Sequence, residues 1–403
     1  MRPFDGRRVL LGVTGGIASY KTVMLARLLT QAGAEVDVVM TRAAQEFVGA
    51  ITFEAVTGRR SYSEIFGSGN ALDHIRLANE AQVFVVAPAT ADFLARAAHG
   101  HADDLLSAAL LANTSPVILV PAMNDRMWAN VQTAANVASL RDRGYNVVEP
   151  DTGPLAAGEG SGPGRMPEPE TILAHIARTL ESDDALAGRQ IVVTAGATRE
   201  AVDPVRFISN HSTGRMGIAI AEAAWRRGAS VTLVLGHVDV PVGSGPEIVR
   251  TESVDEMAAA VASALPRADA LVMAAAPADF RPTRAANKKI SKRDESAGMA
   301  IELSPTTDIL RATLPIRPPG AVIVGFALET GDALAKGEAK LKEKSLDMIV
   351  VNDALEPGAG FGVDTNRVTI LARGHSPEQL PLMSKAAVAD AILDRVGPLL
   401  RGR

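Results

Sequence analysis

Residues 8–16, RVLLGVTGG, decide the fold of the first half of the chain. A short apolar run that ends in glycines and leads into a helical pattern predicts a first β-strand with an open loop at its carboxyl end. Residues 190–198, QIVVTAGAT, repeat this pattern at the start of the second half. In open α/β sheets, ligands bind at the carboxyl ends of the strands. The sequence therefore predicts one binding edge in each half.

Short apolar runs alternate with helical patterns through both halves, which predicts parallel sheets and an α/β fold class with two doubly wound domains. After the two opening runs, the expected strands are 35–40, 82–87, 117–120, 230–235, 270–275, 321–325 and 347–351, and the expected helices are 17–32, 170–180, 214–227, 254–265, 331–345 and 383–396. Residues 181–184 form a polar break. The expected domains are residues 1–181 and 186–403.

Composition agrees with two soluble domains: the chain has 403 residues, 47% of them hydrophobic and 22% charged. A net charge of −5 excludes a bulk electrostatic hold on nucleic acid or anionic membrane. The absence of cysteine excludes disulfides, cysteine-ligated zinc, iron–sulfur clusters and a thiol nucleophile. No apolar leader precedes the first strand, and no apolar stretch reaches the roughly 18 residues of a membrane span. A cytoplasmic location is expected.

The turn at residues 14–21, TGGIASYK, is the first candidate ligand site. Glycines let the backbone approach a phosphate, and a helix amino end supplies free N–H groups. The alternative is a tight turn that packs the helix on the strand. Thr41 and Arg42 follow the next strand, where a dinucleotide site would carry a ribose-binding acid. A hydroxyl and a cation there favour a monophosphate such as FMN over NAD.

Two further strands of the first half end in polar segments, residues 87–92 and 121–128. Asn124, in the second segment, is expected either to hold a carboxylate or amide or to cap the following helix. His74 is expected in a loop before the strand at 82–87. A lone histidine is more often structural or solvated than catalytic.

Together, TGGIASYK, His74, APATADF (87–93), HADDLLSAAL (101–110) and PAMNDRMW (121–128) resemble the homo-oligomeric flavin-containing Cys decarboxylases in order and spacing, over about residues 6–180. The resemblance implies a flavodoxin-like flavoprotein domain that decarboxylates a cysteine carboxyl end with FMN. It implies His74 as catalytic base and Asn124 on the substrate carboxylate. The flavin contacts it implies are Gly15, Gly16, Ser19, Thr41, Ala89, Thr90 and Ser107, and the further substrate contacts are Met127 and Arg165.

The second half carries a long polar segment, DPVRFISNHSTGRMG (203–217), after its first strand. Its glycine-rich loop enters a helix near Thr213, which suits phosphates or an acyl phosphate. The alternative is a helix start capped by Ser212 or Thr213. Asp279 follows a later strand and is placed to reach a ribose or magnesium. A basic run at 281–298 contains Lys289 and Lys292, although charge runs are usually solvated faces.

These segments, with KISK (289–292), VGFALET (324–330), AKLKEK (339–344) and ND (352–353), resemble phosphopantothenate–cysteine ligase over about residues 188–400. The resemblance implies a Rossmann-like domain in which Asn210 stabilises an acyl-cytidylate, Lys289 assists its conversion to amide, and Arg206 contacts substrate. The CTP contacts it implies are Ala275, Asp279, Lys289, Asp308, Ile309, Leu310, Phe326, Lys340 and Lys344, with Asp308–Leu310 near the triphosphate. Magnesium is expected to bridge phosphate oxygens rather than occupy a protein cage.

The order of the two halves resembles the bifunctional enzymes of coenzyme A biosynthesis. Such an enzyme couples 4′-phosphopantothenate to cysteine with CTP and decarboxylates the product to 4′-phosphopantetheine. The resemblance also implies trimers of first halves and dimers of second halves, hence a dodecamer. Two alternatives are a non-catalytic flavin-binding regulatory protein of the same fold and a nucleotide-dependent oxidoreductase. His74 and the complete second-half signature weigh against the former, and the missing GxGxxG and ribose acid weigh against the latter.

Residues 151–169, rich in glycine and proline, predict a long mobile loop, with a flap at 151–167, before the helix at 170–180. The flavin-containing Cys decarboxylases that the first half resembles carry a cysteine in a flap pattern LACGxxGxGRM. This chain has Ala157 at the position of that cysteine. Three explanations stand. Glu159 or a flap water donates the proton instead, since a dry flap raises a carboxyl pKa. The enzyme stalls with reduced flavin. The alanine was introduced deliberately. The first is favoured because the rest of the flap is intact.

Overall fold

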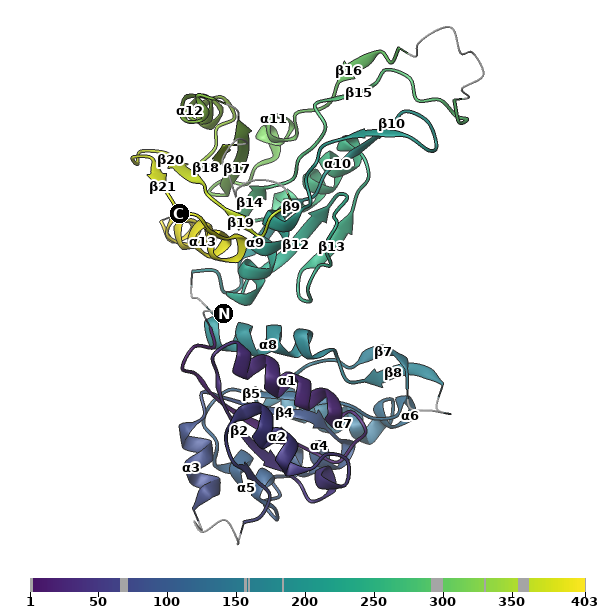
Figure 1. The fold of residues 1–403 in the computed structure, drawn as a ribbon, viewed down its shortest axis with the longest axis vertical. Helices are drawn as coiled ribbons and strands as arrows, with labels where there is room; N and C mark the ends of the chain where they lie inside the picture. The colour runs from purple at the N-terminus through teal and green to yellow at the C-terminus, as the bar shows by residue number, and fades with distance from the viewer. Residues whose placement is uncertain are drawn as a thin grey trace. The chain divides into compact units, whose positions relative to one another are not determined.

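The structure is a computed structural model that describes residues 3–65, 72–155, 158, 160–182, 185–290, 300–329, 331–353 and 362–402. The chain forms two compact units, Met1–Glu181 and Ser182–Arg403 (Figure 1). Each unit has hydrophobic clusters on both faces of its own sheet. Within the described ranges, no helix is long and apolar enough to cross a membrane.

The first unit contains a six-stranded parallel sheet in the order β3-β2-β1-β4-β5-β6. Its strands are β1 (Arg8–Val13), β2 (Glu35–Met40), β3 (Ser61–Tyr62), β4 (Val83–Ala89), β5 (Val117–Pro121) and β6 (Asn146–Val147). Without the two-residue edge strand β3, this is the 2-1-3-4-5 order of flavodoxin-like folds. The order reverses between β1 and β4, which is where such folds bind their ligand.

Helices cover both faces of this sheet, which explains why its strands are apolar along their whole length. The helical elements are α1 (Ser19–Gln31), η1 (Ala43–Glu46), α2 (Ala50–Thr57), α3 (Asp73–Glu80), α4 (Ala91–His99), α5 (Leu105–Ala112), α6 (Asp125–Trp128), α7 (Val131–Asp142) and α8 (Pro169–Glu181). Leu25 of α1 and Ile172 of α8 pack on one face with Leu11, whereas Phe93 of α4 packs on the other with Leu10. Burying one such side chain contributes about 1.5–3 kcal/mol.

Two segments of the first unit differ from the sequence expectation. His74 does not lie in a loop but in the first turn of α3, because Leu77 and Ala78 anchor this eight-residue helix in the core. So short a pattern gives no periodic signal. The predicted mobile loop contains an antiparallel hairpin of β7 (Asp151–Pro154) and β8 (Ser161–Arg165). A two-stranded hairpin has only edge strands, which tolerate proline. Ala157 and Glu159 lie outside the described residues.

The second unit contains an eight-stranded sheet in the order β13-β12-β9-β14-β17-β18-β20-β21. The parallel strands are β9 (Gln190–Ala195), β12 (Ser230–Leu235), β13 (Glu247–Arg250), β14 (Ala270–Met273), β17 (Val322–Glu329) and β18 (Met348–Asp353). β20 (Thr369–Ala372) and β21 (Glu378–Gln379) continue the sheet antiparallel. The parallel part has the 3-2-1-4-5-6 order of Rossmann folds. The predicted fold class, two doubly wound α/β domains, is confirmed.

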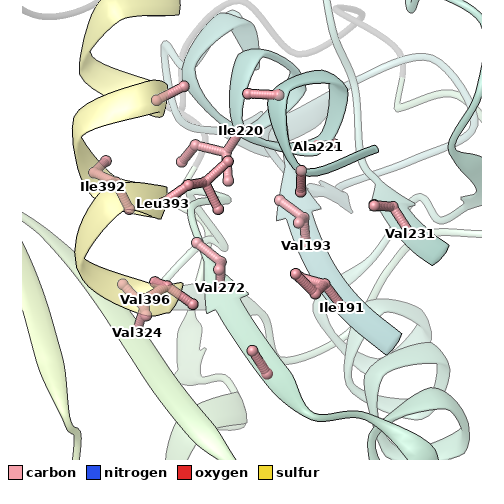
Figure 2. Packing of buried hydrophobic residues seen from close by; sticks show 14 of the residues in the cluster. Ile191, Val193, Ile220, Ala221, Val231, Val272, Val324, Ile392, Leu393 and Val396 are labelled. Atoms are coloured by element: carbon pink, nitrogen blue, oxygen red, sulfur yellow. The ribbon is translucent and has the colours of Figure 1, made fainter. Parts of the chain in front are cut away.

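Helices again cover both faces. They are α9 (Arg215–Arg226), α10 (Val254–Ala264), η2 (Leu265–Arg267), α11 (Ile309–Ala312), η3 (Leu314–Ile316), α12 (Ala333–Glu343) and α13 (Lys385–Arg401). Figure 2 shows α9 and α13 packing Ile220 and Leu393 toward Val193 and Val272 of the sheet. At Gly217 a Cβ atom would lie 2.6 Å from the Ala195 Cβ, so α9 can approach β9 this closely only with glycine there.

Short strands beyond the main sheet were not predicted, because two or three residues carry no periodic signal. They are β10 (Arg199–Ala201), β11 (Phe207–Ser209), β15 (Phe280–Pro282), β16 (Leu303–Pro305), β19 (Thr365–Asn366) and β22 (Met383–Ser384). β10 pairs with β11, and β15 pairs with β16, both antiparallel. Figure 1 shows β10, β15 and β16 projecting together from the second sheet.

Candidate functional sites

A cavity of about 390 Å³ lies at the strand reversal of the first unit. Its walls come from the turns that follow β1, β4 and β5 and from the end of β8. The sequence-predicted residues that line it are Gly15, Gly16, Thr90, Asn124, Met127 and Arg165. The structure therefore brings both the phosphate turn and the asparagine segment to one place, the edge where the parallel strands end.

The turn after β1 is tied directly to the end of β4. The Thr14 hydroxyl donates to the carbonyl of Pro88 (2.7 Å) and accepts from the N–H of Thr90 (3.1 Å). α1 begins without a side-chain cap. The N–H groups of Ser19 and Lys21 donate to the carbonyls of Gly16 (3.0 Å) and Ala18 (2.9 Å), so an anion at this turn would bind its other N–H groups. At Gly15, close packing of the turn explains the glycine, because a Cβ there would lie 2.4 Å from the Ala43 Cβ. Gly16 lines the cavity with no such crowding.

Asn124 takes one of the two roles considered for it, and it is placed for the other. It is the N-cap of α6, and its Oδ1 accepts from the N–H of Arg126 (2.9 Å). It also lines the cavity, and within the described part of the chain its Nδ2 has no hydrogen-bond partner. The cap fixes the side chain while the amide nitrogen stays available to a carboxylate.

Several predicted flavin contacts do not line this cavity. The Ser19 hydroxyl donates to the carbonyls of Thr14 (3.1 Å) and Gly16 (2.7 Å), so it shapes the turn. Thr41 Oγ1 accepts from the N–H of Ala44 at 3.2 Å. The remaining two are Ala89, buried at the end of β4, and Ser107, which forms a capping box with Asp104 at the start of α5. Their flavin contacts stay predictions.

His74 also lies away from the lining of the cavity. Its ring is half-buried on α3, and its Nδ1 atom is buried without a hydrogen-bond partner among the described residues. α3 is held by Arg76, which bonds the carboxylate of Asp73 (2.9 Å) and the hydroxyl of Tyr62 (3.1 Å). The role of His74 as catalytic base stays a prediction.

The sequence reasoning missed Lys21, a buried lysine in the first-unit cavity. Its Nζ donates to the carbonyl of Met166 (2.8 Å) and to Glu168 Oε1 (3.0 Å), and Arg165 bonds the same carboxylate. The hydrogen bond from Lys21 is the main reason that the pKa of Glu168 lies below its ordinary value. The signal was present, because Lys21 falls in phase with the buried Leu25 and Leu29 on α1.

Two adjoining cavities, of about 270 Å³ and about 240 Å³, lie at the carboxyl ends of the strands in the second unit. They share Ala275, Pro277, Asp279 and Phe326. The first also includes Lys340 and the amino end of α9, whereas the second includes Lys344 and Asp308–Leu310. All the predicted CTP contacts except Lys289 therefore line this pair of cavities.

The amino end of α9 is uncapped. Its N-cap is Gly214, with no side-chain hydrogen bond, so the capping role considered for Ser212 and Thr213 is wrong. The Ser212 hydroxyl instead accepts from the N–H of Gly214 at 3.3 Å. Within the described residues, Arg215 Nε and Asn352 Oδ1 are buried without partners, and both residues line the same cavity. Arg215 and the amino end of α9 suit an anionic ligand, whereas Asn352 Oδ1 is an acceptor that needs a donor from the ligand.

Two of the predicted CTP lysines are held by carboxylates. Lys340 Nζ lies 2.6 Å from Glu329 Oε1, and its hydrogen bond lowers the pKa of that carboxyl. Lys344 Nζ lies 3.0 Å from Asp308 Oδ2. Burial raises the pKa of Asp308, but hydrogen bonds from Lys344 and from the Arg311 N–H outweigh burial and lower it. Both lysines are therefore fixed in position and partly neutralised before any nucleotide binds.

Three predicted ligase residues border the cleft or lie outside it. Asn210 Nδ2 donates to the carbonyls of Ala276 (3.2 Å) and Pro277 (3.0 Å), two residues of the cavity wall. Arg206 and Lys289 are exposed and line neither cavity. Lys292 lies outside the described residues.

Three further polar residues line the second-unit cleft: Asn352, Asn366 and Lys385. The sequence reasoning named Asn352 only as part of a matching motif and missed the other two. Asn352 Nδ2 donates to Asn366 Oδ1 at 2.8 Å. Burial lowers the pKa of Lys385, the first residue of α13. Lys385 was detectable because it follows the N-cap Ser384 and falls in phase with the buried apolar side of the helix.

Family models match both units. The model described as Flavoprotein matches residues 2–181, and the model described as DNA/pantothenate metabolism flavoprotein C-terminal domain matches residues 186–399. The coenzyme A biosynthesis bifunctional protein CoaBC of Mycobacterium tuberculosis is 46% identical over 410 residues, covering 98% of this chain and 97% of that protein. The protein of the same name from Bacillus subtilis is 42% identical over 402 residues, covering 98% of each chain. A crystal structure of the C-terminal domain of CoaBC is 35% identical, covers 55% of this chain and all of that one, and has a TM-score of 0.47.

The fold and the matching family models define a two-domain α/β enzyme with a flavoprotein domain followed by a ligase domain. The chain belongs to the family of bifunctional coenzyme A biosynthesis proteins. The resemblance drawn from the motifs is thereby confirmed, together with the prediction of one chain with decarboxylase and ligase activities.

Proposed function

We propose that the chain catalyses two consecutive reactions. The second unit uses CTP to couple 4′-phosphopantothenate to cysteine through an acyl-cytidylate, and the first unit uses FMN to decarboxylate the product to 4′-phosphopantetheine. One observation carries the proposal: all the predicted CTP residues except Lys289, from segments far apart in the chain, line one pair of adjoining cavities. The names of the full-length relatives and the two matching family models support it.

The first-unit cavity fits FMN in three respects. It lies at the reversal point where flavodoxin-like folds hold this cofactor. Its uncapped α1 turn suits the phosphate. Apolar walls such as Met123 and Leu155 suit a flat ring. When bound, the flavin supplies the reversible oxidation of the thiol carbon that makes loss of the neighbouring carboxylate feasible.

The residues of the chain then bind, orient and move protons. Asn124 Nδ2, held by its cap bond, donates to the substrate carboxylate before CO₂ leaves. Met127 and Arg165 flank the substrate at the mouth of the cavity. His74 acts as base through its ring, whose Nδ1 has no hydrogen-bond partner among the described residues.

In the ligase, CTP spans the pair of cavities. Its triphosphate lies near Asp308–Leu310 and Lys344, whereas Lys340 and the uncapped end of α9 line the adjoining cavity. Within the described part of the chain, no group of three or more acidic or histidine side chains could hold a metal, so magnesium is assigned to the phosphates of the nucleotide. Asn210 lies against the cavity wall and stabilises the acyl-cytidylate. Lys289 assists the attack that forms the amide.

The proposal includes assembly and location. First units form trimers and second units form dimers, giving a dodecamer in the cytoplasm. Exposed large apolar side chains in each unit are candidates for the buried surfaces of these interfaces. They include Ile17, Ile51 and Val131 in the first unit and Phe207 and Phe280 in the second. Size measurement of each separate unit and of the full chain tests this part.

The decisive experiment is mass spectrometry of the products formed from 4′-phosphopantothenate, cysteine and CTP. We expect CO₂, pyrophosphate and 4′-phosphopantetheine, with a flavin absorbance spectrum for the purified protein. Replacing CTP by ATP should slow pyrophosphate release. Flavin binding with neither product would favour the regulatory protein, and hydride transfer to a nicotinamide would favour the oxidoreductase.

A further inference from the structure

The carboxylate of Asp203 is fully buried and saturated with donors from the loop that carries Arg206. Its Oδ1 accepts from the N–H groups of Val205 and Arg206, both at 2.8 Å. Its Oδ2 accepts from Arg206 Nε (2.9 Å), from Arg206 Nη2 (2.6 Å) and from the N–H of Ile290 (3.1 Å). None of the roles assigned above uses this side chain.

These bonds join two segments that are far apart in sequence. The N–H of Ala286 donates to the carbonyl of Val202 (2.9 Å), and Arg206 Nη2 donates to the carbonyl of Ile290 (2.7 Å). Residues 286–290 are therefore attached to residues 202–206 at both of their ends. Lys289 lies between the attachments and is bonded covalently to Ile290, so its backbone cannot move independently of Asp203.

The same bonds engage only one edge of the Arg206 guanidinium, and the other edge remains available to a ligand. Nε and Nη2 face Asp203, whereas Nη1 has no partner among the described residues, and the side chain is about half-exposed. Burial raises the pKa of Asp203, but the hydrogen bonds from Arg206 and from the backbone of Ile290, Val205 and Arg206 outweigh burial and hold that pKa well below its ordinary value. The carboxylate is ionised at neutral pH and keeps one edge of the guanidinium engaged.

We propose that Asp203 is a positioning residue of the ligase, which fixes Arg206 and Lys289 on one rigid scaffold and presents both cations to the anionic groups of the substrates. This inference rests on the proposed ligase function, which assigns substrate contact to Arg206 and amide formation to Lys289. Asp203 itself touches no substrate. Asp203 orders Arg206 and Lys289 before substrate binds. These two long cationic side chains therefore lose less conformational entropy on binding.

Asp203→Asn is the sharpest variant. The amide oxygen can still accept from the N–H groups of Val205 and Arg206, which preserves the turn. The new NH₂ group would face Arg206 and the Ile290 N–H, which are also donors. The substitution therefore keeps the loop and releases Arg206 and residues 286–290.

The first test measures both half-reactions in the full-length protein. We expect Asp203→Asn to slow amide formation by about a hundredfold, the usual consequence of misplacing a reacting group by about 1 Å. Acyl-cytidylate should accumulate in quenched samples, and the KM for 4′-phosphopantothenate should rise. The double variant Asp203→Asn with Lys289→Gln should be no slower than Lys289→Gln alone. Two results would overturn the proposal. One is a double variant in which the rate losses of the two single variants multiply. The other is an Asp203→Asn protein in which pyrophosphate release falls as much as amide formation.

Two controls separate positioning from general damage. Glu378→Gln breaks a bidentate carboxylate–arginine pair with Arg395 in the same unit. Neither of these two residues lines the adjoining cavities, so this variant should leave ligation unchanged. Decarboxylation of supplied substrate by the first unit should also be unchanged in Asp203→Asn. Where Asp203→Asn lowers the yield of folded protein, Ile290→Pro removes the N–H donor to Asp203, and it also fixes the backbone at 290 and restricts that of Lys289. It should slow amide formation in the same way.

Hydrogen exchange distinguishes failure of this inference from failure of the proposed function. In Asp203→Asn the amide of Ile290 should exchange faster, while that of Ala286, bonded to Val202, should change less. A wild-type protein without ligation, but with this exchange pattern, would refute the function and keep the attachment. Normal ligation in both proteins, or unchanged exchange at Ile290, would refute the role of Asp203.

Discussion

The two units share one strand plan but differ in the chemistry of their sites. Each places its cavities where parallel strands end, at a reversal of strand order. In the described part of the first unit, no carboxylate lines the cavity, and Lys21 is its buried cation. The second-unit cleft contains Asp279, Asp308 and lysines already paired with carboxylates. The fold therefore sets where a ligand binds, and the side chains set which ligand.

This difference follows from what each site is proposed to do. A flavin ring is held by apolar contact and one phosphate, so a single anion-binding turn is sufficient. A nucleoside triphosphate brings several negative charges, which require multiple fixed cations in a partly dry cleft. The pairing of Lys340 with Glu329 keeps the empty cleft from collecting uncompensated positive charge.

The largest expected effect tests whether the first site is catalytic. His74→Asn should retain flavin and lower CO₂ release by about a thousandfold, as expected on losing a general base. Flavin absorbance and headspace CO₂ give the two readouts. A variant that decarboxylates normally would show that His74 is structural on α3.

The second prediction tests whether the two sites are independent. Lys289→Gln and Asn210→Asp should each lower amide formation by about a hundredfold or more. Asp at 210 cannot donate to the carbonyls of Ala276 and Pro277, so it should also shift the cavity wall. Decarboxylation of supplied substrate should be unchanged, since the sites lie in separate units. Equal loss of both activities would indicate a misfolded assembly or a shared site.

The third prediction concerns the flap residues that lie outside the described part of the chain. Ala157→Cys should raise completed turnover by about tenfold or less, because a replacement donor already supplies most of the hundredfold or more that a general acid contributes. Glu159→Gln should leave CO₂ release intact but bleach the flavin as reduced cofactor accumulates. An unchanged yield of 4′-phosphopantetheine in Glu159→Gln would remove Glu159 from the mechanism.

The smallest effect concerns the buried cation of the first unit. Glu168 has a lowered pKa because of Lys21, so its stabilising contribution is fully present above the ordinary glutamate pKa and is lost as pH falls through the lowered value. Glu168→Gln should therefore destabilise the unit at neutral pH and make no difference in strong acid. The loss should be at most about 1 kcal/mol, because Glu168 is half-exposed and solvent screens the pair. Denaturant unfolding of both proteins at neutral and acid pH measures this loss of stability. An equal loss at the two pH values would show that the pair of Glu168 with Lys21 is not its cause.

The amino-acid sequence by itself predicted the fold class, the sheet edges at which the cavities lie, and a set of CTP residues most of which line the second-unit cavities. These features are encoded in short windows: apolar runs that end in glycine, as in residues 8–16, and dense motifs such as residues 203–217. The sequence did not show which polar side chains of a motif form hydrogen bonds to nearby groups of the protein. Ser19 and Ser107 look like ligand contacts in the motif but direct their hydroxyls to nearby backbone or to Asp104.

Only the tertiary structure decided how distant segments complete each site. Lys21 meets Met166 across 145 residues of sequence, and Asp203 meets Ile290 across 87. No local pattern records such a pairing, because it depends on which strands become neighbours and on which faces the helices then cover. The burial of Lys21, the hairpin of the flap and the attachment of Lys289 to Asp203 therefore arise from packing, which creates the dry surroundings in which a polar group must find a partner.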